Sequence, residues 1–232
     1  TYDGKEAHER NTIGATRLLL EAAAKHGIKQ FLHTSSIAVL KPSRRFSAAL
    51  TEDSPVDAGN LGRGPYVWGK AEAERMVTEF CATHGIEQRQ IRLGPLVDYA
   101  NFTAPGRLGR EVGPLYVAMG MPGNRLSVCD VNTASNVIRY YLENFGTAPA
   151  MLNLVESPQP TRGDLAKRLR SARPDLGFFW LPLSVVWLLS LVLKLMLRLM
   201  KPGKKPLDLY SAFVSERYNA ALAAEVIAKA KG

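Results

Sequence analysis

The chain has 232 residues, of which 46% are hydrophobic and 22% are charged, as is ordinary for a globular protein with a substantial core. Much of its net charge of +9 lies after residue 160, without the interleaved exposed aromatic residues or the motif of a nucleic-acid-binding protein, which favours a membrane surface over DNA or RNA as an acidic partner. The two cysteines, Cys81 and Cys129, form no Cys-x-x-Cys motif, and the four histidines show no metal-ligand spacing. We therefore expect core thiols in a reducing compartment and no metal site.

The first predicted elements are a helix and a buried strand. Asn11 or Thr12 can cap a helix that continues to residue 26, and residues 31–35 then read as a strand of a parallel sheet. This order is half of a βαβ unit, and ligands of such sheets bind beyond the carboxyl ends of the strands. The residues at that position are Ser35 and Ser36.

A loop, a long helix and a second strand follow. Residues 41–65 are rich in proline, glycine, serine and charge, which predicts a loop that covers the site. The helix begins at Tyr66 and ends near residue 84, before Gly85. The second strand covers residues 87–93.

The rest of the predicted domain contains an irregular stretch and three regular elements. Residues 98–113 are irregular and contain Arg107 and Arg110, which could bind a phosphate or could be solvated loop arginines. The expected regular elements are a helix over 130–144, a strand over 151–155, and a helix over 165–171 that opens with a capping box at Thr161-Arg162-Gly163-Asp164.

The segment Phe178–Met200 is almost wholly apolar. A polar stripe, Ser190, Lys194, Arg198 and Lys201, follows a helical spacing down one side. This pattern favours a helix that lies in a membrane interface, with a packed lid or core helix and a membrane-spanning helix as the alternatives. Residues 211–229 are expected to be helical, with no assigned chemistry.

Tyr66 and Lys70 are the candidate chemical pair. Four residues apart on a helix, they lie on the same face. A free phenol titrates at about 10, and a nearby ammonium favours the phenolate, so Tyr66 could act as a general acid or base on a substrate hydroxyl or carbonyl. The alternative is a tyrosine packed at a helix start beside a solvated lysine.

Several segments, in this order, resemble the extended short-chain dehydrogenase/reductase family, in its NAD-dependent epimerase/dehydratase group. Residues 11–23 are similar to the motif N-x-x-G-T…LLEAA, with Ala15 in place of threonine, and residues 31–39 to F-x-x-x-S-S-x-x-V. Tyr66 and Lys70 match Y-x-x-x-K, although Gly69 replaces the common serine. The remaining matches are residues 91–95 with the R-P-G strand end (Leu93 replacing proline), and Asn153 and Thr161 with the later substrate-domain segment.

The resemblance implies an α/β fold: the C-terminal part of a Rossmann-like, doubly wound parallel sheet with a small substrate-binding subdomain and a hydrophobic C-terminal helix. It covers residues 1 to about 172, where we expect the nucleotide-binding domain with interleaved substrate-binding segments. Residues 173–232 are expected to form a hydrophobic and basic, membrane-associated helical extension. Because the family's G-x-x-G-x-x-G turn is not in the sequence, we expect an N-terminally truncated fragment.

The resemblance also implies roles for single residues. Ser36, Tyr66 and Lys70 would be catalytic, and Ser36 and Arg107 would contact substrate. Cofactor contacts, to NAD or NADP, would come from Asn11, Thr34, Ser35, Tyr66, Lys70 and Leu93.

The expected activity is that of an NAD(P)-dependent oxidoreductase, epimerase or dehydratase that transfers hydride at a carbinol or keto carbon of a sugar nucleotide. The first alternative is a dehydrogenase that resembles 3β-hydroxysteroid dehydrogenases, or one that acts on a lipid-linked substrate at the membrane. The second is a non-catalytic, membrane-associated binding protein. We expect a cytoplasmic location and no nucleic-acid partner. Peripheral membrane contact through Phe178–Met200 and a homodimer are both left open.

Overall fold

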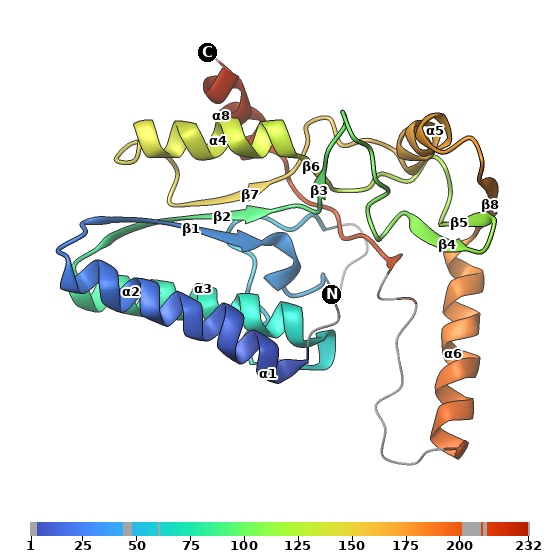
Figure 1. The fold of residues 1–232 in the computed structure, drawn as a ribbon, viewed down its shortest axis with the longest axis horizontal. Helices are drawn as coiled ribbons and strands as arrows, with labels where there is room; N and C mark the ends of the chain where they lie inside the picture. The colour runs from blue at the N-terminus through green and yellow to red at the C-terminus, as the bar shows by residue number, and fades with distance from the viewer. Residues whose placement is uncertain (1–3, 44–47, 60, 201–209, 211–212, 232) are drawn as a thin grey trace. The chain divides into compact units, whose positions relative to one another are not determined.

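The computed structural model describes residues 4–43, 48–59, 61–200, 210 and 213–231 (Figure 1). The chain forms two compact units. The first contains Thr1–Pro95, Val131–Ser157 and Arg217–Gly232, and the second contains Leu96–Asp130 and Pro158–Glu216. The extension expected over residues 173–232 is therefore divided, because its last part returns to the first unit.

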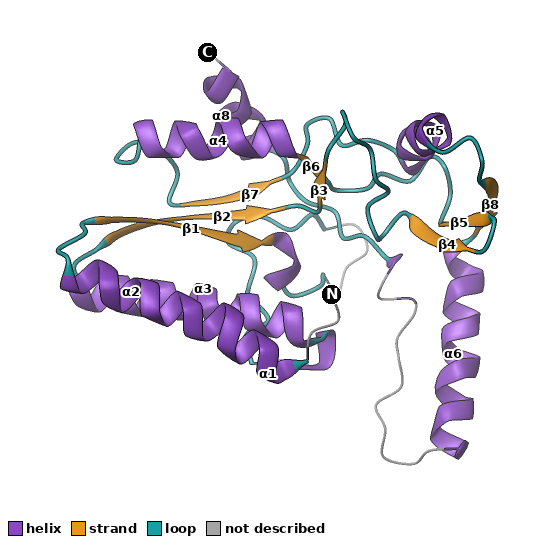
Figure 2. Ribbon diagram, viewed as in Figure 1, coloured by secondary structure: helices purple, strands orange, loops and turns teal. Residues whose placement is uncertain are grey.

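The first unit is a parallel sheet covered by helices on both faces, which confirms the predicted α/β fold (Figures 1 and 2). Its strands are β1 (Gln30–Ser36), β2 (Glu87–Leu93) and β7 (Met151–Leu154), hydrogen-bonded in the order β1-β2-β7. One face carries α2 (Ala15–Lys25) and α3 (Pro65–His84), and the other carries α4 (Val131–Glu143) and α8 (Ala221–Lys231). Both sheet strands predicted before residue 94 are present within one residue of the expected bounds.

The N-terminal helix begins earlier than the sequence indicated. It starts with α1 (Lys5–His8), continues through a π-helical segment, Glu9–Gly14, and passes into α2. The prediction that Asn11 or Thr12 caps this helix is wrong, because both lie inside the π-helical segment. The backbone stays in the right-handed helical region on both sides of that segment, so no cap is required there.

A buried ion pair joins α3 to the sheet. The register of the parallel strands aligns Ser35, Arg92 and Asn153, so their side chains share one face. The Arg92 guanidinium donates to the Glu74 carboxylate of α3 at 2.6 and 3.1 Å, with both side chains almost fully buried. Arg92 also donates to the Glu52 carbonyl oxygen at 2.9 Å, so the pair connects α3, β2 and the loop before α3.

The second unit contains a small mixed sheet together with helices α5 (Arg162–Ala172) and α6 (Leu183–Met200). Strands β4 (Gly109–Val112) and β5 (Leu115–Met119) are antiparallel, and β8 (Gly177–Leu181) pairs in parallel with β5. A separate short pair consists of β3 (Leu96–Val97) and β6 (Cys129–Asp130). Helix α5 opens with the predicted capping box, in which Thr161 and Asp164 bond each other's backbone N–H groups. Its Leu165 packs with Leu108, Leu126 and Val128 in the core of this unit.

The apolar segment Phe178–Met200 is divided between two elements rather than one helix. Residues 178–181 belong to β8, and helix α6 (Leu183–Met200) begins after Pro182, which has no N–H to continue the sheet. Among the helices that the structure describes, none combines the length and apolar character needed to cross a membrane. Within the predicted stripe Ser190 is buried, whereas the Arg198 side chain and Lys201 lie outside the described residues.

Two further expectations concern the C-terminus and the thiols. The helix expected over residues 211–229 begins only at Ala221, because residues 214–220 are not helical and Leu50 forms a β-bridge with Tyr218. Residues 211 and 212 lie outside the described part of the chain. Cys81 and Cys129 are not joined in a disulfide and are fully buried, as predicted.

Breaking the Glu74–Arg92 pair should destabilise the first unit strongly. Glu74→Gln leaves a buried guanidinium without its counter-charge, and we expect the free energy of unfolding to fall by about 3 kcal/mol or more. Urea denaturation measures this change. The matched control is Glu79→Gln, because Glu79 is 63% exposed and pairs with Arg75 at the surface, where the loss should stay below about 0.5 kcal/mol. Equal losses in the two variants would contradict the prediction.

Candidate active site

The start of α3 lies at the carboxyl end of β1. Pro65 occupies the first turn of α3, and Tyr66 and Lys70 follow one helical turn apart. The Lys70 Nζ donates to the Thr34 carbonyl oxygen at 3.2 Å. Because Thr34 precedes Ser36 by two residues, this contact brings the Tyr66–Lys70 side of α3 to the end of the strand that carries Ser36.

Ser36 is the last residue of β1 and pairs in register with Leu93, the last residue of β2. Its side chain is nearly buried, and its Oγ accepts from the Ala38 backbone N–H at 3.2 Å. This bond opens the helical turn Ile37–Val39, which packs against α3. Since the Oγ only accepts in this bond, its O–H can still donate to a substrate oxygen.

Tyr66 is half exposed, at 48%, and the His8 ring meets it edge to face at 6.0 Å between ring centroids. Helix α1 approaches α3 closely here. A Cβ at Gly69 would lie 3.1 Å from the His8 Cβ, which accounts for glycine where the family commonly has serine. The sequence analysis missed His8, because it assessed the histidines only for metal-ligand spacing.

Lys70 belongs to a row of polar residues one turn apart on α3, namely Tyr66, Lys70, Glu74 and Thr78, which we call the polar row of α3. Below Lys70, Glu74 bonds Arg92, and the Thr78 Oγ1 accepts from the Gln90 amide at 2.9 Å. Burial lowers the pKa of Lys70, and the only hydrogen-bond partner of its ammonium among the described residues is the Thr34 carbonyl. Two of its three N–H groups are thus available to a ligand.

The other predicted cofactor residues lie at different depths. Asn11 is exposed in the π-helical segment, which packs against α3, and its Oδ1 accepts from the Arg10 Nε at 3.2 Å. Thr34 is exposed on β1. Ser35 is buried, and its Oγ has no hydrogen-bond partner within the described part of the chain.

Arg107, the predicted substrate contact, lies in the second unit, where its guanidinium donates to the Val214 carbonyl oxygen. Its role toward a substrate phosphate stays a prediction.

The loop over residues 41–65 runs back along the segment that follows Ser36. The Asp57 N–H donates to the Val39 carbonyl oxygen at 2.8 Å, and the Arg63 guanidinium donates to that of Leu40 at 2.7 Å. The loop is thus attached beside the strand end, and its covering of the site stays a prediction.

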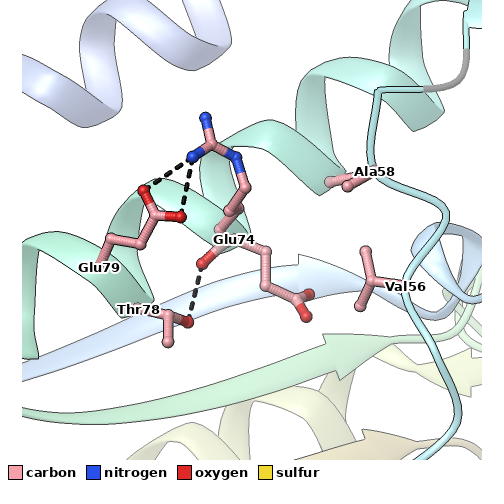
Figure 3. Close-up of a pocket in the computed structure, with 7 residues that line it drawn as sticks. Val56, Ala58, Glu74, Thr78 and Glu79 are labelled. Carbon is pink, nitrogen blue, oxygen red and sulfur yellow. Dashed lines mark hydrogen bonds and ion pairs between the residues drawn. The ribbon is translucent and has the colours of Figure 1, made fainter.

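A pocket of about 270 Å³ lies further along α3 (Figure 3). Val56 and Ala58 of the preceding loop lie opposite Glu74, Thr78 and Glu79, and the Glu74 carboxylate points toward the loop. That carboxylate is already engaged by Arg92, and none of the predicted site residues lines the pocket. The pocket is therefore separate from the candidate active site.

His33 is a buried titratable residue that the sequence analysis did not assign. It lies on β1 and faces α3, where burial, and secondarily Lys70, lowers its pKa to about 4 against an opposing effect of Glu74. Its Nε2 is buried, and no group of the described residues bonds it. A histidine inside a buried strand gives no sequence signal beyond its position next to Thr34.

The free energy of unfolding should fall as the pH falls from 6.5 to about 4. In this range the unfolded chain binds a proton at His33 that the folded chain does not, so stability rises with pH by up to about 3 kcal/mol. Chemical denaturation at several pH values measures the slope. His33→Gln should flatten it, whereas His84→Gln, at an exposed histidine, should not. An unchanged slope in His33→Gln would contradict the assignment.

Comparison with known proteins agrees with the resemblance seen in the motifs. Residues 2–104 match the model of the NAD dependent epimerase/dehydratase family. No curated protein matches the chain in sequence.

Three solved structures share the fold. The gox2253 structure is 19% identical and covers 98% of this chain and 69% of its own, with a TM-score of 0.69. The terminal R domain from the myxalamid PKS-NRPS pathway is 17% identical and covers 98% and 59%, with a TM-score of 0.66. UDP-glucuronic acid 4-epimerase from Bacillus cereus, in complex with NAD, is 18% identical and covers 71% and 54%, with a TM-score of 0.53. The chain thus spans only part of each, and its residues 2–104 match the family that the motifs of this segment predicted.

Proposed function

We propose that Ser36, Tyr66 and Lys70 form the acid–base centre of an NAD(P)-dependent oxidoreductase of the epimerase/dehydratase type. The observation that supports this proposal best is the 3.2 Å hydrogen bond from Lys70 to the Thr34 carbonyl oxygen, because it joins the helix that carries Tyr66 to the strand that ends at Ser36. The family-model match over residues 2–104 supports the reaction class, because the matched segment contains all three residues.

The residues at this end fit the nicotinamide–ribose part of a dinucleotide. Lys70 has two N–H groups for ribose hydroxyls, and Ser35 has a buried hydroxyl with no partner in the described chain, which a bound polar group can satisfy. Thr34 and Asn11 add exposed polar groups, and Leu93 adds an apolar contact. The bound nucleotide would accept a hydride from the substrate carbon and return it. NAD in the epimerase structure agrees with this choice of cofactor, with NAD or NADP left open.

The chain's own groups move the proton and stabilise charge. Tyr66, half exposed, takes the proton from a substrate hydroxyl or returns it to a carbonyl oxygen. The Lys70 ammonium lies one turn along the same face of α3 as Tyr66. The Ser36 O–H donates to the reacting oxygen and stabilises the negative charge that develops there.

For the substrate we propose a sugar nucleotide, and we propose that Arg107 contacts one of its phosphates. Support comes from the UDP-sugar named for the Bacillus cereus epimerase and from the preference of guanidinium for phosphate.

Exposed apolar residues on α6 favour the second candidate, a sterol-like or lipid-linked alcohol. The third candidate, a non-catalytic membrane-associated binding protein, has no need of all three residues of the centre.

Tyr66→Phe should lower kcat by at least about 100-fold while nicotinamide nucleotide binding is retained, because the variant loses only the ionisable hydroxyl. Nicotinamide absorbance follows turnover, and fluorescence titration follows binding. Tyr140→Phe on α4 is the matched control and should keep full activity. If Tyr66→Phe turns over normally, Tyr66 has no acid–base role.

A substrate screen separates the candidates. Sugar nucleotides and sterol-like alcohols are offered in parallel to the protein with NAD or NADP, and absorbance of the reduced nicotinamide is recorded. Turnover of sugar nucleotides alone supports the first proposal, and turnover of the alcohols alone supports the second. Nucleotide binding without turnover of either class favours the non-catalytic reading.

A further inference from the structure

Helix α6 presents apolar side chains outward. Val186 and Ser190 are its buried residues among those described, at 3% and 2% exposure. Between them and beyond them, large apolar side chains are 46–54% exposed, namely Trp187, Leu188, Leu189, Val192, Leu195 and Met196. Water-soluble surfaces rarely carry so many adjacent apolar groups, so this face indicates an interaction surface.

Two polar residues of α6 belong to its less exposed row. Val186, Ser190 and Lys194 are spaced four residues apart, so they share one side of the helix, and Lys194 is only partly exposed. Ser190 and Lys194 are thus less exposed than the large exposed apolar side chains of the helix. This is the reverse of a surface helix that simply covers a core.

The outer face of the neighbouring sheet continues this apolar character. The register of β5 with β8 places Leu115, Val117 and Met119 on the same face as Phe179 and Leu181, because alternate residues of a strand share a face. Leu115 and Phe179 are 46% and 56% exposed. The inner face, with Tyr116 and Phe178, packs in the core instead. We call the exposed apolar residues of α6 the apolar patch.

The charge of the sequence that contains α6 indicates what covers the patch. From residue 177 to residue 206 the sequence contains five cationic residues and no acidic residue, and these are Lys194, Arg198, Lys201, Lys204 and Lys205. A second copy of this chain would bring five more cations, which opposes pairing by like-charge repulsion. A surface with anionic headgroups and apolar chains beneath them complements both features.

We infer that the apolar patch docks peripherally on a membrane surface that contains anionic phospholipid. The Trp187 and leucine side chains enter the boundary between headgroups and acyl chains, and the cations that follow in the sequence attract phosphatidylserine-like headgroups. The inference does not depend on the proposed reaction.

Co-sedimentation with vesicles tests this inference. The protein is mixed with phosphatidylcholine vesicles, with and without phosphatidylserine, at low and high salt. We expect binding only where phosphatidylserine is present, and weaker binding at high salt. Leu188→Glu/Val192→Glu places two carboxylates in the patch and should lower the bound fraction at least tenfold. The matched control, Leu18→Glu/Leu142→Glu, alters two leucines that are 68% and 65% exposed outside the patch, and should bind as the original chain does.

Circular dichroism and thermal unfolding check that both double variants keep their fold, as is expected for exposed positions. Full binding by Leu188→Glu/Val192→Glu would overturn the inference, as would absence of the original chain from the phosphatidylserine pellet. Light scattering of the protein without vesicles measures its oligomeric state and so tests the alternative that a second copy of this chain covers the patch. A dimer that Leu188→Glu/Val192→Glu converts to a monomer, together with no vesicle binding, would assign the patch to a second copy instead.

Discussion

The buried pair between Glu74 and Arg92 is the interaction on which the first unit depends. It attaches α3 to the central strand β2, and through the Glu52 carbonyl oxygen it also holds the loop that leads into α3. Lys70 is one turn above Glu74 and Tyr66 one turn above Lys70, so the position of the ion pair along the sheet sets where the phenol lies. A buried pair is weak support for net stability, but it is directional, and here direction determines the site.

Much of the first unit could be predicted from local patterns. The strands over 30–36 and 87–93 each follow a helix that ends at a glycine, and Gly85 after the long helix α3 has a φ of 63°, which suits glycine. The capping box of α5 is equally local. These features depend on a few neighbouring residues, and for that reason a single sequence is enough to place them.

The features that sequence reasoning missed depend on distant partners. Nothing near Glu74 in the sequence indicates that it will form a buried ion pair with Arg92, 18 residues later. Likewise, nothing near residues 178–181 indicates that they will pair with β5 as a strand. The continuous helix through Asn11 was missed because a polar residue before an apolar run reads as a cap, whereas α3 packs along this segment and supports it as helix. The candidate site is intermediate: its residue types were predictable from motifs, whereas the contact of Lys70 with Thr34, which joins α3 to the end of β1, is visible only in the structure.

The polar row of α3 has a consequence for how the unit tolerates change. Two apolar surfaces can slide or rotate slightly and still pack, so apolar contacts alone allow a helix several positions along a sheet. The hydrogen bonds of α3 with Thr34, Arg92 and Gln90 require specific distances and angles, so they fix one position of α3 along the sheet. The position of the Tyr66 hydroxyl therefore depends on groups as far along α3 as Thr78, three turns away, and the partners that fix this position are residues of the sheet.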